Sequence, residues 1–189
     1  LQMKIFISVF ILIFSIQSWI KADDIRDFEI EGMSIGDSLL EHVSLERIKS
    51  RTTQYYPKSK KYVGYMRIKE TKFYDETIAR VVDGDKDYNI VSINGIINYK
   101  NNISECYSKK KEIVQEIYSE IGGDKKEYIY NYPNDDSKSD VTDLIFSNGR
   151  VRVFCTDYSK SREEKNYMDH LSVAVSTSEY LKWLSTSAR

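Results

Sequence analysis

The most chemically suggestive residues of this sequence lie near its C-terminus, where His170 directly follows Asp169. Asp157 would lie beside this pair if the strands that carry the three residues are neighbours. Histidine titrates near neutral pH and is the usual general base of enzymes. A Ser–His–Asp hydrolase also needs its nucleophile in a tight turn such as G-x-S-x-G, and no such motif occurs. A small hydrolase that uses Asp157, Asp169 and His170 therefore remains an alternative, and we favour a structural or surface role for the histidine.

Two acidic stretches carry the oxygen ligands that calcium prefers. The first, Asp83-Gly84-Asp85-Lys86-Asp87, alternates its carboxylates like an EF-hand loop, which also requires Gly at its sixth position and Glu at its twelfth. Tyr88 and Asn94 occupy those two places, so we expect a turn here. The second stretch groups Asp135, Asp136, Asp140 and Asp143. A calcium-stabilised envelope protein is a second alternative, but we predict neither a metal site nor a cofactor.

Tyrosine is frequent, with 15 residues. Tyr128, Tyr130 and Tyr132 alternate along the chain, so they share one face if this segment is a strand. Tyrosine suits binding surfaces because its ring is apolar and its hydroxyl forms hydrogen bonds. Half-buried sheet tyrosines and the codon bias of an AT-rich genome are the simpler explanation for most of them. The candidate binding residues are Tyr65, Asp157, Asp169 and His170.

A long helix at 102–121 is the element that must organise these candidates. Its apolar residues recur three or four positions apart, and Asn102 with Glu105 is typical of a capping box. Gly122-Gly123 ends the helix, because Gly enters a left-handed C-cap at no steric cost. We expect the run Lys109-Lys110-Lys111 to lie on a solvated face.

The chain has two cysteines, Cys106 in the apolar stripe of this helix and Cys155 in a later strand. In an exported chain, two cysteines at core-facing positions are expected to pair. Such a disulfide would join the long helix to the sheet. Two buried free thiols are the competing interpretation, and a catalytic dithiol is disfavoured because C-x-x-C spacing is lacking.

Residues 1–22 have the layout of a secretory signal peptide. Lys4 precedes an apolar run at 5–16, which is shorter than the roughly 20 residues that a membrane-spanning helix needs, and Ala22 suits cleavage. A retained membrane anchor is the competing interpretation. Cleavage leaves a single domain, 23–189, that is periplasmic or secreted and has no membrane span. The leader holds two of the 28 basic and none of the 29 acidic residues, so this domain has a formal charge of −3, which argues against a nucleic-acid partner.

The remaining pattern predicts an α+β fold with a mostly antiparallel sheet, helices packed on one face and no internal repeat. Asn94-Gly95 and Ser147-Asn148-Gly149 are typical hairpin turns. We expect strands at 27–31, 62–69, 76–82, 88–93, 96–99, 127–132, 141–146, 151–155 and 171–175. We expect short helices at 34–43, capped by Ser34, at 45–51, and after a capping box of Ser176 and Glu179, with loops at 52–61, 134–140 and 159–166.

Four stretches, 27–40, Cys106-Tyr107, 155–160 and 169–172, are distributed over most of the chain after the leader. They are similar to an uncharacterised family of small exported proteins of AT-rich marine bacteria. This resemblance implies a small exported domain and no particular activity. Gly32-Met33-Ser34 also resembles the opening of small outer-membrane assembly lipoproteins and β-lactamase-inhibitor-like domains, over a short stretch and without the lipidated cysteine.

These features together predict a small exported domain without catalytic activity. Its partner would be an unknown protein or small-molecule ligand. The leader and the expected disulfide favour export, and the lack of a nucleophile motif favours binding over hydrolysis.

Overall fold

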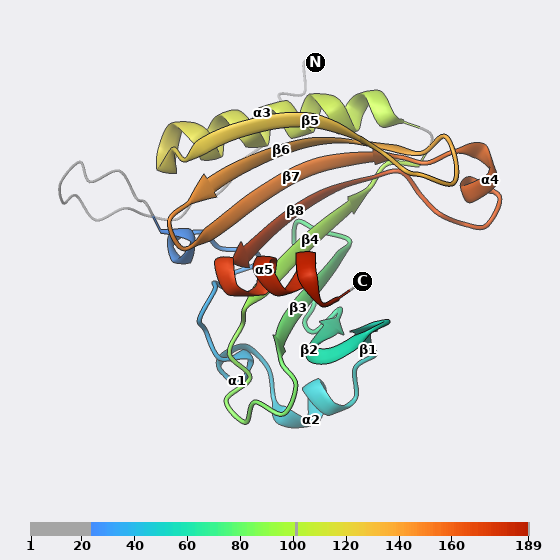
Figure 1. The fold of residues 1–189 in the computed structure, drawn as a ribbon. Helices are drawn as coiled ribbons and strands as arrows, with labels where there is room; N and C mark the ends of the chain where they lie inside the picture. The colour runs from blue at the N-terminus through green and yellow to red at the C-terminus, as the bar shows by residue number, and fades with distance from the viewer. Residues whose placement is uncertain (1–23, 101, 189) are drawn as a thin grey trace, which may run out of the picture.

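The computed structural model describes residues 24–100 and 102–188 and contains one eight-stranded sheet with helices packed against it (Figure 1). The α+β class and the antiparallel sheet are confirmed, because every pair of neighbouring strands runs antiparallel. The predicted leader, residues 1–22, lies outside the described residues. In the described part of the chain, no helix is long and apolar enough to cross a lipid bilayer.

The strands follow the order β1-β2-β3-β4-β8-β7-β6-β5, so β1 and β5 are the two edges of the sheet. The strands are β1 (Thr53–Tyr56), β2 (Ser59–Met66), β3 (Glu76–Val82), β4 (Ser92–Asn98), β5 (Asp124–Asn131), β6 (Lys138–Phe146), β7 (Gly149–Asp157) and β8 (His170–Thr177). The helices are the 3-10 helix η1 (Ile25–Asp27) and the α-helices α1 (Leu39–His42), α2 (Leu45–Lys49), α3 (Ile103–Ile121), α4 (Lys160–Glu163) and α5 (Ser178–Thr186).

The topology repeats although the sequence shows no repeat. Helices α1 and α2 precede the meander β1–β4, and helix α3 precedes the meander β5–β8. The last strands of the two meanders pair with each other, from Ser92 opposite Ser176 to Asn98 opposite His170. Each half therefore supplies one edge of the sheet, and the β4–β8 ladder is the seam between them.

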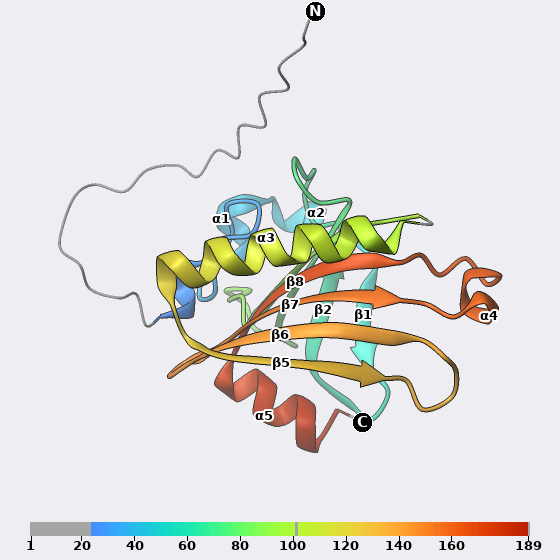
Figure 2. The ribbon, with the colours of Figure 1, turned by 90° about the horizontal axis from the view of Figure 1, so that it is seen from above.

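Helix α3 lies along one face of the second half of the sheet (Figure 2). Its buried residues, including Val114 and Ile117, join the main core with the β7 and β8 residues that face them. The Asn102 side chain accepts a hydrogen bond from the Glu105 N–H, and Gly122 has a φ of 75° at the C-cap. The predicted helix and its two ends are confirmed.

Cys106 of α3 and Cys155 of β7 form a disulfide, as predicted, across a sequence separation of 49 residues. Both cysteines are completely buried. The covalent link thus joins the long helix to the middle of the second half of the sheet, and no cysteine of the described residues is free.

Helix α5 covers the opposite face, which corrects the expectation that all helices pack on one face. Val63 belongs to the main core, whereas its neighbour Tyr62 points to the other side of the sheet. There the Tyr62 ring packs edge-on against Tyr180 and Trp183 of α5, with ring centroids 5.2 and 4.7 Å apart. Alternation along β2 therefore supplies both cores. Figure 2 shows α3 and α5 on the two sides of strands β5–β8.

The hairpin predicted at Asn94-Gly95 is wrong, because both residues lie inside β4. Gly95 pairs with Thr77 of β3 and Val173 of β8. A Cβ atom on Gly95 would lie 2.6 Å from the ring of Tyr74. The glycine is needed for close packing of this ring rather than for a turn.

Replacing Gly95 with Ala is expected to lower the free energy of unfolding by about 1–3 kcal/mol, the usual range for overpacking. The matched control is Gly64→Ala in β2, where the nearest atom to the added Cβ is 3.3 Å away. Urea unfolding of both variants measures the difference. Equal losses would mean that contact with Tyr74 does not explain this glycine.

Several other local predictions, in both halves of the chain, are also wrong. The segment 27–31 is not a strand, and Ile30 forms only an isolated bridge with Met33. The Ser34 N–H donates to the Asp37 carboxylate at 2.8 Å, which makes a turn, so α1 begins later with Ser38 as its cap. The β1–β2 hairpin lies within the expected loop 52–61, and α4 lies within the expected loop 159–166. Strand β6 begins at Lys138, inside the expected loop 134–140, and Thr177 rather than Ser176 caps α5. The hairpin turn at 147–148 is confirmed, because β6 ends at Phe146 and β7 begins at Gly149.

Candidate functional site

The structure does not assemble the three residues of the hydrolase alternative. His170 pairs with Thr156 in the β7–β8 ladder, and its ring packs against Phe154 at 6.1 Å. Asp157 follows Thr156, so its side chain points to the other face, where its carboxylate lies 3.3 Å from Lys138 Nζ. The hydrolase alternative therefore has no assembled catalytic group.

Asp169 and His170 are engaged in structural contacts. Asp169 is 5% exposed and accepts a hydrogen bond from the Tyr158 N–H at 2.8 Å, while its burial raises the pKa of its carboxyl. Burial also lowers the pKa of His170, and its Nδ1 lies 3.1 Å from the Met168 carbonyl oxygen. Burial is the main cause of both pKa shifts, and the contacts with Tyr158 and Met168 oppose them.

Tyr65, the fourth candidate, lies in the other half of the sheet. The centroid of its ring lies 6.1 Å from the ring centroid of Tyr88, and both rings pack against the main core. Burial raises the pKa of Tyr65 to about 12. Tyr65 sits on β2 and the other candidates sit on or beside β7 and β8, so the four do not form one site.

The two acidic stretches also have structural roles. Asp85 accepts hydrogen bonds from the backbone N–H groups of Asp87 and Asn89 at 3.0 and 2.9 Å, which is the geometry of a turn. In the second stretch, Asp135 pairs with Arg162 and Asp140 with Lys110, both at 2.6 Å. Within residues 24–100 and 102–188, no group of three or more His, Cys, Asp or Glu residues could hold a metal ion.

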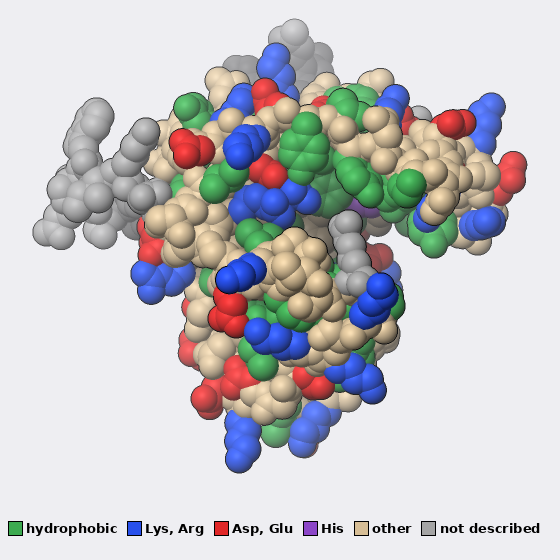
Figure 3. All heavy atoms as spheres, in the orientation of Figure 1, with side chains coloured by type: hydrophobic (Ala, Val, Ile, Leu, Met, Phe, Trp, Pro, Cys, Tyr) green, Lys and Arg blue, Asp and Glu red, His purple; other side chains and the backbone are tan. Residues whose placement is uncertain are grey.

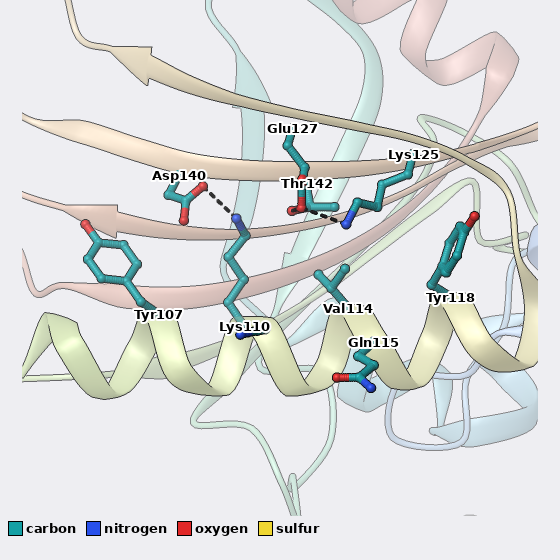
Figure 4. A pocket seen from close by; sticks show the side chains of 10 residues that line it. Tyr107, Lys110, Val114, Gln115, Tyr118, Lys125, Glu127, Asp140 and Thr142 are labelled. Carbon is teal, nitrogen blue, oxygen red and sulfur yellow. Dashed lines mark hydrogen bonds and ion pairs between the residues drawn. The ribbon is translucent and has the colours of Figure 1, made fainter.

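A groove lies between α3 and the strands β5 and β6 (Figure 4). Its volume is about 610 Å³. Lys110 crosses it to Asp140 and is only 6% exposed, which corrects the expectation that the whole lysine run faces solvent. Lys125 and Glu127 form a second ion pair at 3.0 Å. Because these charges neutralise each other in pairs, the groove offers few groups for a charged ligand.

The sheet face opposite α3 carries a larger group of aromatic and basic side chains in the second half. We call it the aromatic-basic face, and Figure 3 shows hydrophobic and basic side chains gathered above α5. The rings other than Tyr128 form a continuous series with centroid distances of 5.1 to 6.4 Å. The face consists of Tyr128, Tyr130, Tyr132, Arg150, Arg152, Phe154, Tyr158, Tyr167 and His170.

Alternation along the strands produces this face. Tyr128 and Tyr130 of β5 lie directly opposite Val141 and Ser139 of β6, as the predicted shared side of these tyrosines requires. In β7, Arg150, Arg152 and Phe154 point away from the disulfide side because they alternate with Val151, Val153 and Cys155. We missed the two arginines in the sequence, although this alternation was the signal that could have revealed them.

The charges of the face centre on one buried carboxylate. Asp143 is 4% exposed and faces Arg152 directly across the β6–β7 ladder. Its two oxygens accept from Arg152 Nε at 2.7 Å and Nη2 at 2.9 Å, and Oδ2 also accepts from Arg150 Nη1 at 3.2 Å. The Tyr128 hydroxyl donates to the same carboxylate at 3.3 Å. Two guanidinium groups thus share one carboxylate.

The two arginines differ in how strongly they pair with Asp143, which accepts two hydrogen bonds from Arg152 and one from Arg150. Burial and the neighbouring charge of Arg152 lower the pKa of Arg150. Burial also opposes the charge of Arg152, but its hydrogen bonds with Asp143, the negative charge of Asp143 and the interaction with Tyr128 together outweigh that effect and raise the pKa of Arg152. Lys126 stands opposite Asp143 on β5 and adds a further cation. The cluster therefore carries a surplus of positive charge.

No protein-family model, curated protein or solved structure matches this chain. The function must therefore be inferred from the side chains of the aromatic-basic face and the groove beside α3.

Proposed function

We propose that this chain is a small exported, non-catalytic domain that binds another protein through the aromatic-basic face. The main observation behind the proposal is that a series of aromatic rings and a positively charged cluster lie on the same uncovered face of the sheet. Tyrosine, phenylalanine and arginine are the residues enriched at protein interfaces. Tyrosine and arginine are also enriched among the few contacts that supply most of the binding energy.

The charge of the face favours a partner that presents carboxylates. Arg150 and Arg152 have one carboxylate, Asp143, between them, and their side chains remain 22% and 29% exposed. An incoming carboxylate would complete the hydrogen bonds of these planar donors. Such complementarity also accelerates association and excludes basic partners.

The rings of the face pack against one another before any partner binds. Tyr130 packs against Tyr132, and Tyr158 packs against Tyr167, at 5.1 and 5.2 Å between ring centroids. The exposed fractions of Tyr130 and Tyr167 are 42% and 45%. Rigid aromatic side chains with open surfaces lose little conformational entropy on binding, which favours affinity.

Export is supported by the disulfide, since such bonds persist mainly in oxidising compartments. The signal-peptide layout of residues 1–22 and the resemblance to small exported proteins of AT-rich marine bacteria point in the same direction. Periplasmic or secreted localisation is therefore part of the proposal. A redox-sensitive reporter fused to the full chain in the source organism would test it.

Binding is tested with the purified domain as bait against the exported proteins of the source organism. Tyr130→Ala and Tyr167→Ala remove exposed rings from the face, and Tyr118→Ala is the matched control because Tyr118 of α3 is 49% exposed on the other side. A partner captured by wild type and control is then purified, and its affinity is measured by calorimetry. We expect each face variant to weaken it about tenfold, and added salt to weaken it further.

Two outcomes would refute the proposal. One is that no protein distinguishes the face variants from the control. The other is that the captured partner depends on Tyr118 instead. Circular dichroism of each variant shows that the fold is intact before binding is compared.

A further inference from the structure

Strand β5 is a long, exposed edge strand whose charged side chains lie at 124–127 and whose remaining part, 128–131, is uncharged. All eight of its residues are exposed, and it pairs with β6 over Asp124–Asn131 without a shift of register. The other edge, β1, has four residues, a register shift between Tyr55 and Tyr56, and Pro57 directly after it. Native proteins prevent unwanted pairing with short or irregular edges and with charged side chains, especially lysine. β1 is short and irregular, whereas β5 is long and regular and carries its charges, including Lys125 and Lys126, in its first half.

The outward-pointing backbone groups of β5 can be assigned from its hairpin. The Tyr132 N–H donates to the Ser137 carbonyl oxygen at 3.0 Å, so Tyr132 points its backbone groups toward β6. In an antiparallel pair, hydrogen-bonded positions alternate along the strand. Tyr128 and Tyr130 therefore also face β6, and the outward N–H and C=O groups belong to Lys125, Glu127, Ile129 and Asn131.

We infer that a second copy of this chain pairs antiparallel with β5, so that the two sheets become continuous. A two-fold axis that is perpendicular to the sheet and passes through Ile129 places the aromatic-basic faces of both copies on the same side of the joined sheet. In that register Ile129, which is 55% exposed, covers the same residue of the second copy. The other opposed pairs are Tyr128 with Tyr130, Glu127 with Asn131, and Lys126 with Tyr132.

The charges of β5 support a second copy as the occupant. The register centred on Ile129 opposes no like charges, and it sets the Lys126 ammonium against an aromatic ring, a favourable cation–π arrangement. A register centred on Lys126 would instead oppose two identical cations, which is destabilising. Aromatic pairs directly opposite each other are among the stabilising cross-strand contacts. The strand is thus self-complementary in the register centred on Ile129.

This interface goes beyond the proposed function, because it uses the backbone edge of β5 rather than the arginines of β7. It would place the aromatic-basic faces of two copies next to each other. The two inferences can fail separately, because Tyr167 lies outside β5 and the edge contributes nothing to its contacts with Tyr158.

The test is the molar mass of the domain in solution, measured by light scattering after gel filtration from about 1 μM to about 1 mM, the range of weak association. Ile129→Pro removes one outward N–H and leaves the hydrogen bonds to β6 in place. An edge strand tolerates proline at such a position, because the lost N–H faces away from the sheet. Ile129→Lys keeps the backbone and opposes two cations. The matched control Ile129→Thr keeps both the N–H and the β-branched shape.

We expect wild type and Ile129→Thr to reach the dimer mass, and Ile129→Pro and Ile129→Lys to remain monomeric with an unchanged circular dichroism spectrum. A monomeric wild type over the whole range would overturn the inference. So would a dimer that survives in Ile129→Lys at low salt, a result that stays informative even if Ile129→Pro fails to fold.

Discussion

Replacing both Cys106 and Cys155 with Ala is expected to lower the free energy of unfolding by about 4 kcal/mol. The disulfide closes a loop with a sequence separation of 49 residues, and the chain-entropy relation gives this value for such a loop. The link restricts the unfolded chain, so its removal gives the unfolded state more conformations. Because small domains have only about 5–15 kcal/mol of stability, the double variant would lose a large share of it.

Urea unfolding of wild type and the double alanine variant measures this effect. Wild type unfolded in reductant should approach the curve of the variant, while the variant itself should not respond to reductant. The melting temperature should fall by roughly 10 °C. A loss below about 1 kcal/mol would show that the unfolded chain is already restricted by residual structure.

Asp143→Ala is expected to destabilise the domain by about 3–5 kcal/mol, because it leaves partly buried arginines without their carboxylate. Asp143 has 6% side-chain exposure and bonds both Arg150 and Arg152. The matched control is Glu112→Ala, which breaks the ion pair with Lys109 at 3.0 Å on the surface of α3. An exposed pair of this kind contributes at most about 1 kcal/mol.

A triple variant separates the cost of stranded charge from the value of the network. Asp143→Leu with Arg150→Met and Arg152→Met removes all three charges and keeps comparable volume, so most of the lost stability should return. Chemical unfolding of the single and triple variants decides this. If the triple variant is as unstable as Asp143→Ala, the loss arises from packing and not from unpaired charge. The triple variant should also fail to bind the partner of the aromatic-basic face.

Long elements with strong local signals could be predicted from the sequence. The helix at 102–121 has regular apolar spacing, a polar cap at Asn102 and glycines after Ile121, and these signals agree with each other. The disulfide followed because Cys106 and Cys155 both fall on core-facing positions. The shared side of Tyr128 and Tyr130 followed from strand alternation.

The site itself could not be predicted, because its residues meet only through strand pairing. Asp143 and Arg152 are nine positions apart, and their contact depends on the register of the β6–β7 hairpin. Asn94-Gly95 has the local signature of a turn, yet the ring of Tyr74 and two neighbouring strands hold Gly95 inside β4. Tertiary packing overrides local preference when it buries more surface than a turn would.

The sequence by itself determined which segments are amphipathic, where the long helix ends and which cysteines can pair, because these depend on neighbours within a few residues or on the side of one element. Only the tertiary structure decided which faces are covered and which edge is open. Helix α5 was free to pack on either side of the sheet, and the rings of Tyr62, Tyr180 and Trp183 place it opposite α3. The aromatic-basic face and the open edge of β5 exist because α3 and α5 leave them uncovered, and that depends on long-range contacts that no local pattern encodes.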